Sequence, residues 1–413
     1  MKRRAVITGL GIVSPIGVGI DSFWAAARAG RSGISTPTLF DASKMPRECQ
    51  IVGEVKDFDV RDWMPGTAGR MAGRFSQFAV AAAKMARDDA KLDDAGIPPE
   101  RLFVSVGTSM SGMTDIQQPN FAAFLRGEDM QPWTVLEYPG HAATSHVAMT
   151  SVGRGQTASF SSACVAGVDA IAWAAERVLA GDAAAVIAGA SETPLSQASL
   201  AAFRSLGALS QWTGHPSQAS RPFDRLRSGL VLAEGAAMLI VEDEDHARAR
   251  GARIYARILS AASVTEGTHM RELDAKGTFV SKTIVAALQR ASLLPQDIDY
   301  ICAHGNSLPD YDAAETAGIK SALGKQAKCV PISSIKSMCG QALAASGAMQ
   351  AVTACLAIRD HIVPPTTNYE YPDPACDLDY VPNVPRRVRV TTALIHAQSI
   401  GGSHSALIFG SPN

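Results

Sequence analysis

Short apolar runs alternate with long helical stretches along this chain, and the alternation limits the folds that it can adopt. Strands alternating with helices predict an α/β fold with helices on both faces of a sheet. In the first part of the chain the predicted elements are Ala5–Ile7, Phe75–Lys91, Phe103–Val106, Thr157–Ser161, a helix of about 17 residues after Cys164, Ala185–Gly189 and Ala236–Val241. A second series follows at Arg253–Leu259, Phe279–Arg290, Ile298–Ala303, Ala342–Arg359, Arg389–Leu394 and Ala406–Phe409.

A charged stretch at residues 242–250 separates the two series and predicts a solvated helix. We therefore expect an N-terminal half over residues 1–250 and a C-terminal half over residues 251–413, of similar plan. Residues 113–149 contain several prolines and little periodic pattern. They predict an irregular excursion that covers one end of the sheet.

Composition excludes several classes of function. The net charge of −1 argues against a nucleic-acid or anionic membrane surface, since both require a basic excess. The seven cysteines are odd in number and lack C-x-x-C spacing, so we expect neither a disulfide framework nor a metal site, and a reducing cytoplasm fits best. We find no stretch long and apolar enough to predict a membrane span. Gly9 and Gly11 resemble a dinucleotide loop, but Ser14 occupies the third glycine position, so we expect no cofactor.

Cys164 lies where an apolar strand pattern ends and an alanine-rich helical pattern begins. Free backbone N–H groups and the helix dipole at such a turn stabilise a thiolate and the oxyanion of an attacked thioester. A cysteine at this kind of turn is more often a small buried side chain. Two further clusters change that balance.

His304 follows an apolar run and precedes Gly305, which lets a ligand approach the backbone. Lys336 and Gln341 lie in the turn before the helix at 342–359. Alone, such a histidine is usually structural and such a lysine is usually a surface charge. With Cys164 they form an ordered set of a nucleophile, an imidazole and an ammonium at three turns.

At this point the chain resembles the β-ketoacyl-acyl-carrier-protein synthases, the elongating condensing enzymes of type II fatty-acid and polyketide pathways. The resemblance covers essentially the whole chain. Its blocks are Val6–Gly11, Ser162–Cys164 with Gly167, Ser220–Asp224, Ala233–Ala236, His304–Gly305 with Asp312 and Glu315, Lys336–Met338, and Gly401–Gly402. It implies a thiolase-type fold, in which two βαβαβ-rich halves form a five-layer αβαβα sandwich, and a dimer whose interface lies near the nucleophile strand.

The resemblance also implies roles for single residues. Cys164 would take the acyl chain from a carrier-protein thioester, and His304 would assist decarboxylation of a malonyl thioester and stabilise the enolate. Lys336 would hold that histidine, with Glu315 as its ion partner and Asp312 supporting the same loop. The N–H groups of Cys164 and Ile400 would form the oxyanion hole, with Gly401 beside them at the gate.

Several positions depart from the family pattern. Gln341 replaces a second histidine; its amide can donate a hydrogen bond to a thioester oxygen but cannot carry a proton or a positive charge. An aromatic gate is missing around Ile400, Asn306 replaces a threonine, and only Arg70 and Arg74 remain of the basic residues expected for the acidic carrier.

Three functions therefore stay open. A ketosynthase of a specialised fatty-acid or polyketide pathway, working with an acyl carrier protein as a homodimer or heterodimer, is favoured. The second is a chain-length partner subunit of a ketosynthase heterodimer, against which the retained Cys164 argues. The third is a non-elongating acyltransferase.

Overall fold

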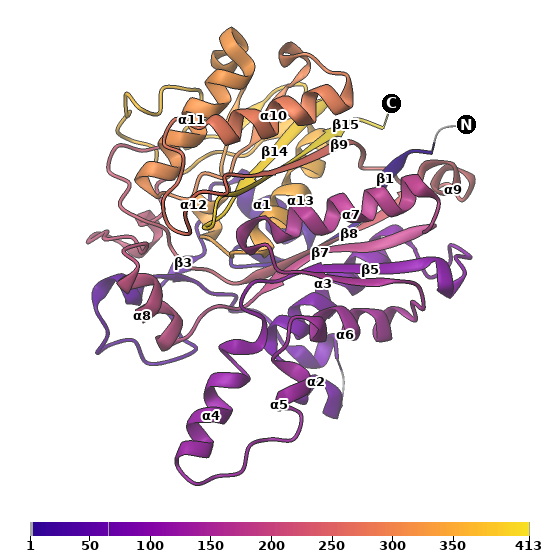
Figure 1. Ribbon diagram of the computed structural model, residues 1–413, viewed down its shortest axis with the longest axis vertical. Helices are drawn as coiled ribbons and strands as arrows, with labels where there is room; N and C mark the ends of the chain where they lie inside the picture. Colours follow the sequence, from indigo (N-terminus) through magenta and orange to yellow (C-terminus); the bar gives the residue numbers. More distant parts are fainter. Residues whose placement is uncertain (1–2, 65, 413) are drawn as a thin grey trace.

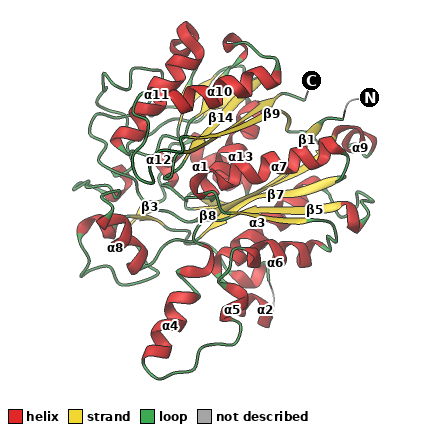
Figure 2. Ribbon diagram, viewed as in Figure 1, coloured by secondary structure: helices red, strands yellow, loops and turns green. Residues whose placement is uncertain are grey.

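The computed structural model describes residues 3–64 and 66–412. Its helices and strands form five layers, which Figure 1 shows from top to bottom and Figure 2 distinguishes by element type. A pair of helices covers one sheet, two central helices separate that sheet from a second one, and further helices cover the far side. This arrangement confirms the α/β class and the five-layer sandwich that the resemblance implies.

The first sheet contains strands that are buried along their whole length. Every residue of β1 (Ala5–Ser14), β5 (Leu102–Gly107), β7 (Ala185–Glu192) and β8 (Gly235–Asp243) is buried, as expected for strands covered on both faces. β1 and β7 pair antiparallel with β8, and β5 pairs parallel with β7 and with β6 (Thr157–Phe160). β6 ends the sheet and alternates between exposed and half-buried residues.

The second sheet follows the order β9 (Ala256–Thr265), β15 (Ser403–Gly410), β14 (Thr392–Gln398), β10 (Tyr300–Cys302) and β11 (Ile332–Ser333). β1 also pairs with β9 through Val6 and Ile7, so hydrogen bonding is continuous from one sheet to the other. The division of the chain at residue 250 stays a prediction.

The helices lie in three layers. α7 (Ala166–Ala180) and α13 (Ala345–Asp360) are central and contact strands of both sheets. α3 (Arg74–Ala90) and α6 (His141–Ser151) cover the first sheet, and α10 (Thr278–Ala291) covers the second sheet and packs on α11 (Pro309–Leu323). Shorter helices are α1 (Ile20–Arg28), α2 (Thr67–Met71), α4 (Gln117–Leu125), α5 (Thr134–Glu137), α8 (Gln197–Ser205), α9 (Glu244–Ala249) and α12 (Lys336–Cys339).

Several elements begin or end at other residues than predicted, and two expectations are wrong. Residues 113–149 contain helices α4 and α5 and most of α6, so the expectation of an irregular excursion is wrong. α4 has no buried residue, so its sequence lacks the apolar stripe from which a helix is predicted. The charged stretch 242–250 is not simply solvated, because Glu242 and Glu244 are buried and paired with arginines. The helix predicted from Ala342 begins at Ala345.

Candidate active site

Cys164 lies in a 3₁₀ turn, Ala163–Val165, between β6 and α7. The preceding Ala163 has φ +54°, a left-handed conformation that costs energy for a residue with a Cβ. The turn directs the chain sharply from the strand into the helix. Cys164 is 8% exposed, at the edge of an apolar cluster, so its thiol is shielded from water but not sealed.

The thiol of Cys164 is protonated at neutral pH. Burial raises its pKa to about 11, against the positive charge of Lys336 and a hydrogen bond from the Gln341 side chain, which favour the thiolate. Burial thus outweighs the thiolate stabilisation expected from the helix terminus alone. Acylation requires that a base or an incoming thioester assist loss of this proton.

Hydrogen bonds fix the side-chain amide of Gln341 in an orientation toward the nucleophile. Its Oε1 accepts a hydrogen bond from Ser346 Oγ at 3.0 Å, which leaves the amide N–H groups to face the Cys164 sulfur. Its backbone is held as well, because Gln341 N–H donates to Val231 O at 2.7 Å and Gln341 O accepts from Ala233 N–H at 2.9 Å. The residue that replaces the expected histidine is therefore a neutral, oriented donor in the site.

His304 follows β10 and is buried. Burial, and then the positive charge of Lys336, hold the pKa of His304 well below its usual range, so the imidazole is neutral. Gln398 N–H donates to Nδ1 at 3.3 Å, and Asn306 Nδ2 lies 3.1 Å from Nε2. A neutral ring accepts at one nitrogen only, so the two donors compete. A bound carbonyl oxygen that accepts a hydrogen bond from Nε2–H would relieve the conflict.

Lys336 begins α12 and is also buried. Its ammonium donates to His304 O and to Gln350 Oε1, the latter at 3.1 Å. Burial lowers the pKa of Lys336, whereas Cys302, Glu315 and Cys164 raise it. The ammonium thus fixes the backbone of the histidine and lies near the nucleophile.

The expected ion pair between Lys336 and Glu315 is wrong for the described residues. Glu315 instead accepts from His304 N–H at 2.7 Å and Gly305 N–H at 2.8 Å, and its Oε1 contacts His396 Nδ1 at 2.7 Å. The backbone donors of the His304 loop and an imidazole use both carboxylate oxygens. Sequence reasoning missed His396 and Gln350, since neither lies in a recognisable motif.

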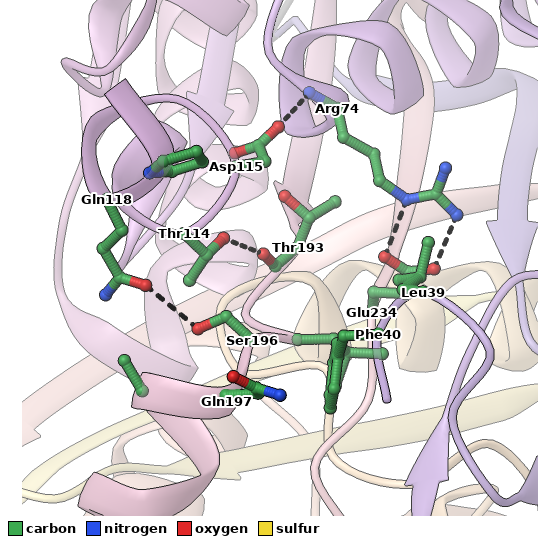
Figure 3. Close-up of a pocket in the computed structure, with 13 residues that line it drawn as sticks. Leu39, Phe40, Arg74, Thr114, Asp115, Gln118, Thr193, Ser196, Gln197 and Glu234 are labelled. Atoms are coloured by element: carbon green, nitrogen blue, oxygen red, sulfur yellow. Dashed lines mark hydrogen bonds and ion pairs between the residues drawn. The ribbon is translucent and has the colours of Figure 1, made fainter. Parts of the chain in front are cut away.

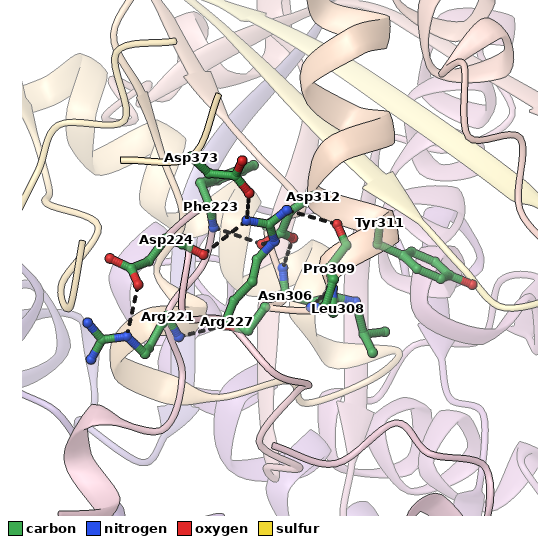
Figure 4. A network of polar contacts seen from close by, with 12 residues as sticks. Arg221, Phe223, Asp224, Arg227, Asn306, Leu308, Pro309, Tyr311, Asp312 and Asp373 are labelled. Carbon is green, nitrogen blue, oxygen red and sulfur yellow. Dashed lines mark hydrogen bonds and ion pairs between the residues drawn. The ribbon is translucent and has the colours of Figure 1, made fainter. Parts of the chain in front are cut away.

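Asp312 supports the His304 loop as expected. Its carboxylate accepts from Asn306 N–H at 3.0 Å and Phe223 N–H at 2.8 Å, and Arg227 Nε lies 3.7 Å away (Figure 4). Burial raises the pKa of Asp312 to about 7, although Arg227 and the backbone donors lower it. The block Ser220–Asp224 was a visible signal for this network, but no sequence pattern assigned a role to Arg227.

Ile400 and Gly401 lie in the turn between β14 and β15. Ile400 lines a cavity of about 200 Å³ with Tyr311 and Arg271. Leu206 and Leu308 also line this cavity and pack against the apolar cluster that contains Cys164, so the cavity lies beside that cluster. Gly401 has φ +90° and its N–H donates to Met270 O at 3.0 Å, so its own N–H is already engaged.

Within residues 3–64 and 66–412, no group of three or more histidine, cysteine or acidic side chains is arranged to hold a metal ion. Over the same residues no helix has the length and apolar character needed to cross a membrane.

Family comparisons agree with this geometry. The model of the β-ketoacyl synthase N-terminal domain matches residues 2–247, and the C-terminal domain model matches residues 255–370. The chain is 38% identical to the tetracenomycin polyketide synthase ketoacyl synthase alpha subunit of Streptomyces glaucescens, over 100% of this chain and 98% of that protein. It is 37% identical to 3-oxoacyl-(acyl-carrier-protein) synthase 2 of Coxiella burnetii, over 98% of each chain.

Solved structures give the same result. A complex of a type II polyketide synthase acyl-carrier protein with its ketosynthase bound to the hexaketide matches with a TM-score of 0.91 and 35% identity over the whole of both chains. The ishigamide ketosynthase/chain length factor matches with a TM-score of 0.92 and 29% identity, again over both whole chains. The predicted family is thereby confirmed: this chain belongs to the β-ketoacyl synthases, acyltransferases that catalyse condensation.

Proposed function

We propose that this protein condenses an acyl chain held on Cys164 with a malonyl unit, through a Cys-His-Gln set in which Gln341 acts as a neutral donor. The fixed orientation of the Gln341 amide toward the Cys164 sulfur is the observation that carries the proposal. The chain serves a specialised fatty-acid or type II polyketide pathway in the cytoplasm.

In the first half-reaction, the Cys164 sulfur attacks the carbonyl carbon of an acyl thioester. A new C–S bond forms, the thiol of the carrier leaves with the proton of Cys164, and the N–H groups of Cys164 and Ile400 hold the oxyanion. The cavity beside Ile400 and Tyr311 borders the apolar cluster that contains Cys164, which supports entry of the thioester from this side.

In the second half-reaction, a malonyl thioester loses CO2, and the electron pair of the broken C–C bond becomes an enolate. His304 Nε2 and the Gln341 amide donate to the enolate oxygen, and Lys336 fixes the backbone beside the ring. The enolate carbon attacks the acyl group, and the Cys164 sulfur leaves. No external oxidant or metal enters this balance.

An acyl carrier protein is the proposed donor of both units, as in the relative whose structure contains carrier and ketosynthase. A second ketosynthase-like chain, identical or different, is the proposed partner. The exposed edge of β6, directly before the nucleophile turn, supports an interface at that place.

The first test concerns the Gln341 amide as a hydrogen-bond donor in condensation. Gln341→Leu removes the amide, so condensation falls about 100-fold, comparable to loss of one oxyanion-hole donor, while acylation of Cys164 seen by intact-protein mass spectrometry persists. Gln341→Asn and Gln341→His are the matched variants and retain part of the condensation. Condensation by Gln341→Leu at the wild-type rate contradicts the role of the amide.

A second test separates His304 from the nucleophile. His304→Ala abolishes decarboxylation of a malonyl thioester but leaves a measurable acyl adduct on Cys164, because the imidazole acts at the enolate step. Cys164→Ser is the control and carries no thioester adduct. If His304→Ala loses acylation as completely as Cys164→Ser does, the assignment of acylation to Cys164 and of decarboxylation to His304 is wrong.

A chain-length partner of another ketosynthase is the second candidate, favoured by the match to a ketosynthase/chain length factor and by the high pKa of the Cys164 thiol, raised by burial. Copurification with a second ketosynthase, together with wild-type protein that neither decarboxylates malonyl thioesters nor accepts an acyl group, favours this alternative. Acyl transfer without decarboxylation favours a non-elongating acyltransferase.

A further inference from the structure

A pocket of about 560 Å³ opens beside α4 and the first turn of α8 (Figure 3). Leu39 and Phe40 line one part of it, and Leu195 lines another. Leu195 and Cys164 belong to the same apolar cluster, and Phe40 packs against that cluster. Leu195 therefore belongs both to the wall of this pocket and to the apolar cluster that contains the nucleophile.

The rest of the pocket wall also contains polar side chains, and most of its charged groups are paired. Arg74 donates to Glu234 at 2.7 and 2.9 Å, so that these two charges satisfy each other. Asp115 accepts from the backbone N–H of Arg74 through Oδ2, and Gln118 Oε1 accepts from Ser196 Oγ at 3.1 Å. These contacts hold the wall in place, as the close-up shows.

Two side-chain oxygens on this wall lack such hydrogen-bond partners. Asp115 Oδ1 and Thr193 Oγ1 are buried and have no hydrogen-bond partner among the described residues. Thr193 is 2% exposed, so bulk water does not satisfy its hydroxyl. A buried polar atom without a partner costs free energy, and such atoms in a pocket mark where a ligand group belongs.

We propose that this pocket receives the acyl chain carried by Cys164 and that Asp115 and Thr193 bind a hydroxyl group on that chain. The inference rests on the proposed function and adds the class of substrate. A hydroxyl group fits the pair because it donates to a carboxylate oxygen while accepting from the Thr193 hydroxyl. A carbonyl cannot donate to the carboxylate. An ammonium can donate to both oxygens, but burying its charge costs far more free energy than burying a neutral hydroxyl group.

The position of the hydroxyl is found with a series of acyl thioesters of equal length, in which one hydroxyl moves stepwise along the chain. The fully saturated chain and matched amino and keto chains complete the series. We expect one hydroxyl position to acylate Cys164 with a kcat/KM about tenfold above that of the saturated chain, the gain of about one hydrogen bond.

Thr193→Val and Asp115→Asn then test the contact. Thr193→Val removes the hydroxyl at nearly constant volume and loses the preference for the hydroxylated chain over the saturated chain. Asp115→Asn keeps an oxygen for the Arg74 N–H and weakens the preference. Thr150→Val, at an exposed position of α6, is the matched control and keeps it.

The outcomes separate this inference from the proposed function. Wild-type protein that takes the saturated chain onto Cys164 but prefers no hydroxyl position, or a preference unchanged in both variants, overturns the hydroxyl site and leaves the proposed function intact. A preference for the amino or keto chains also overturns it. Failure of every thioester to acylate Cys164 overturns both.

Discussion

The chemistry of Cys164 is set by opposing local effects. Burial favours the neutral thiol, whereas Lys336 and Gln341 favour the thiolate, and burial prevails. The free protein therefore stores its nucleophile as a thiol next to two donors. The neutral thiol is protected from oxidation, because the thiolate is the form that reacts with oxidants.

Alkylation of Cys164 by iodoacetamide tests this state. Because the pKa of the thiol is raised to about 11, the thiolate fraction at neutral pH is small, and the rate should rise about tenfold per pH unit between roughly pH 7 and 10. Peptide mapping measures the rate at this residue, with the exposed Cys329 as an internal reference. A plateau of the Cys164 rate near pH 8 contradicts the prediction.

Lys336 offers a companion measurement. Lys336→Met removes the positive charge that lowers the Cys164 pKa, so alkylation at fixed pH should slow. It also leaves His304 O and Gln350 Oε1 without their donor, which costs about 2 kcal/mol in unfolding free energy. Denaturant unfolding measures the second effect, and unchanged values of both quantities contradict the assigned contacts.

At the scale of elements, α7 and α13 approach each other closely where Gly167 lies. A Cβ on Gly167 would come 2.7 Å from Ala344 O and 2.9 Å from Ala348 N. The glycine of the nucleophile block is thus a packing requirement. It sets the distance between the helix that follows Cys164 and the helix that follows Gln341.

Gly167→Ala should therefore separate these helices and lower the unfolding free energy by about 1–3 kcal/mol, as overpacking does. Thermal unfolding measures the loss. The Cys164 alkylation rate should change as well, because the contact with Gln341 is disturbed. Equal stability of Gly167→Ala and wild type contradicts the account.

Elements with strong periodicity were predictable from sequence, and α3 lies within one residue of its predicted bounds, Phe75–Lys91. α4 was not, because its faces differ little in burial. In the site, sequence patterns identified Cys164, His304 and Gln341 as chemically important. They did not reveal that Glu315 pairs with His396, because such a pair depends on how β14 and α11 lie in space.

At the scale of the whole molecule, Glu244 joins three distant segments. Its carboxylate accepts from Arg257 at 2.8 Å, Arg248 at 2.8 Å and Arg4 at 3.2 Å. Burial alone would raise the pKa of Glu244, but these hydrogen bonds lower it to about 2. The residue links the start of the chain, α9 and β9.

Glu244→Gln should destabilise the protein at pH 7 by about 3 kcal/mol. Because the folded-state pKa lies below the ordinary glutamate value of 4.5, the stabilisation is present above pH 4.5 and is lost as the pH falls toward 2. Unfolding of variant and wild type across this range measures the effect, and the two curves should converge at low pH. Curves that stay equally separated contradict the assignment.

β1 lies between β8 and β9, although both of these strands come more than 200 residues after it in the chain. Thr8 on β1 hydrogen bonds to Glu242 on β8, 234 residues later in the chain. During synthesis this apolar strand must therefore remain without β8 and β9 until the chain has reached them. A product truncated before Gly235 would lack both of these neighbours, and we expect it to aggregate through the open edges of β1.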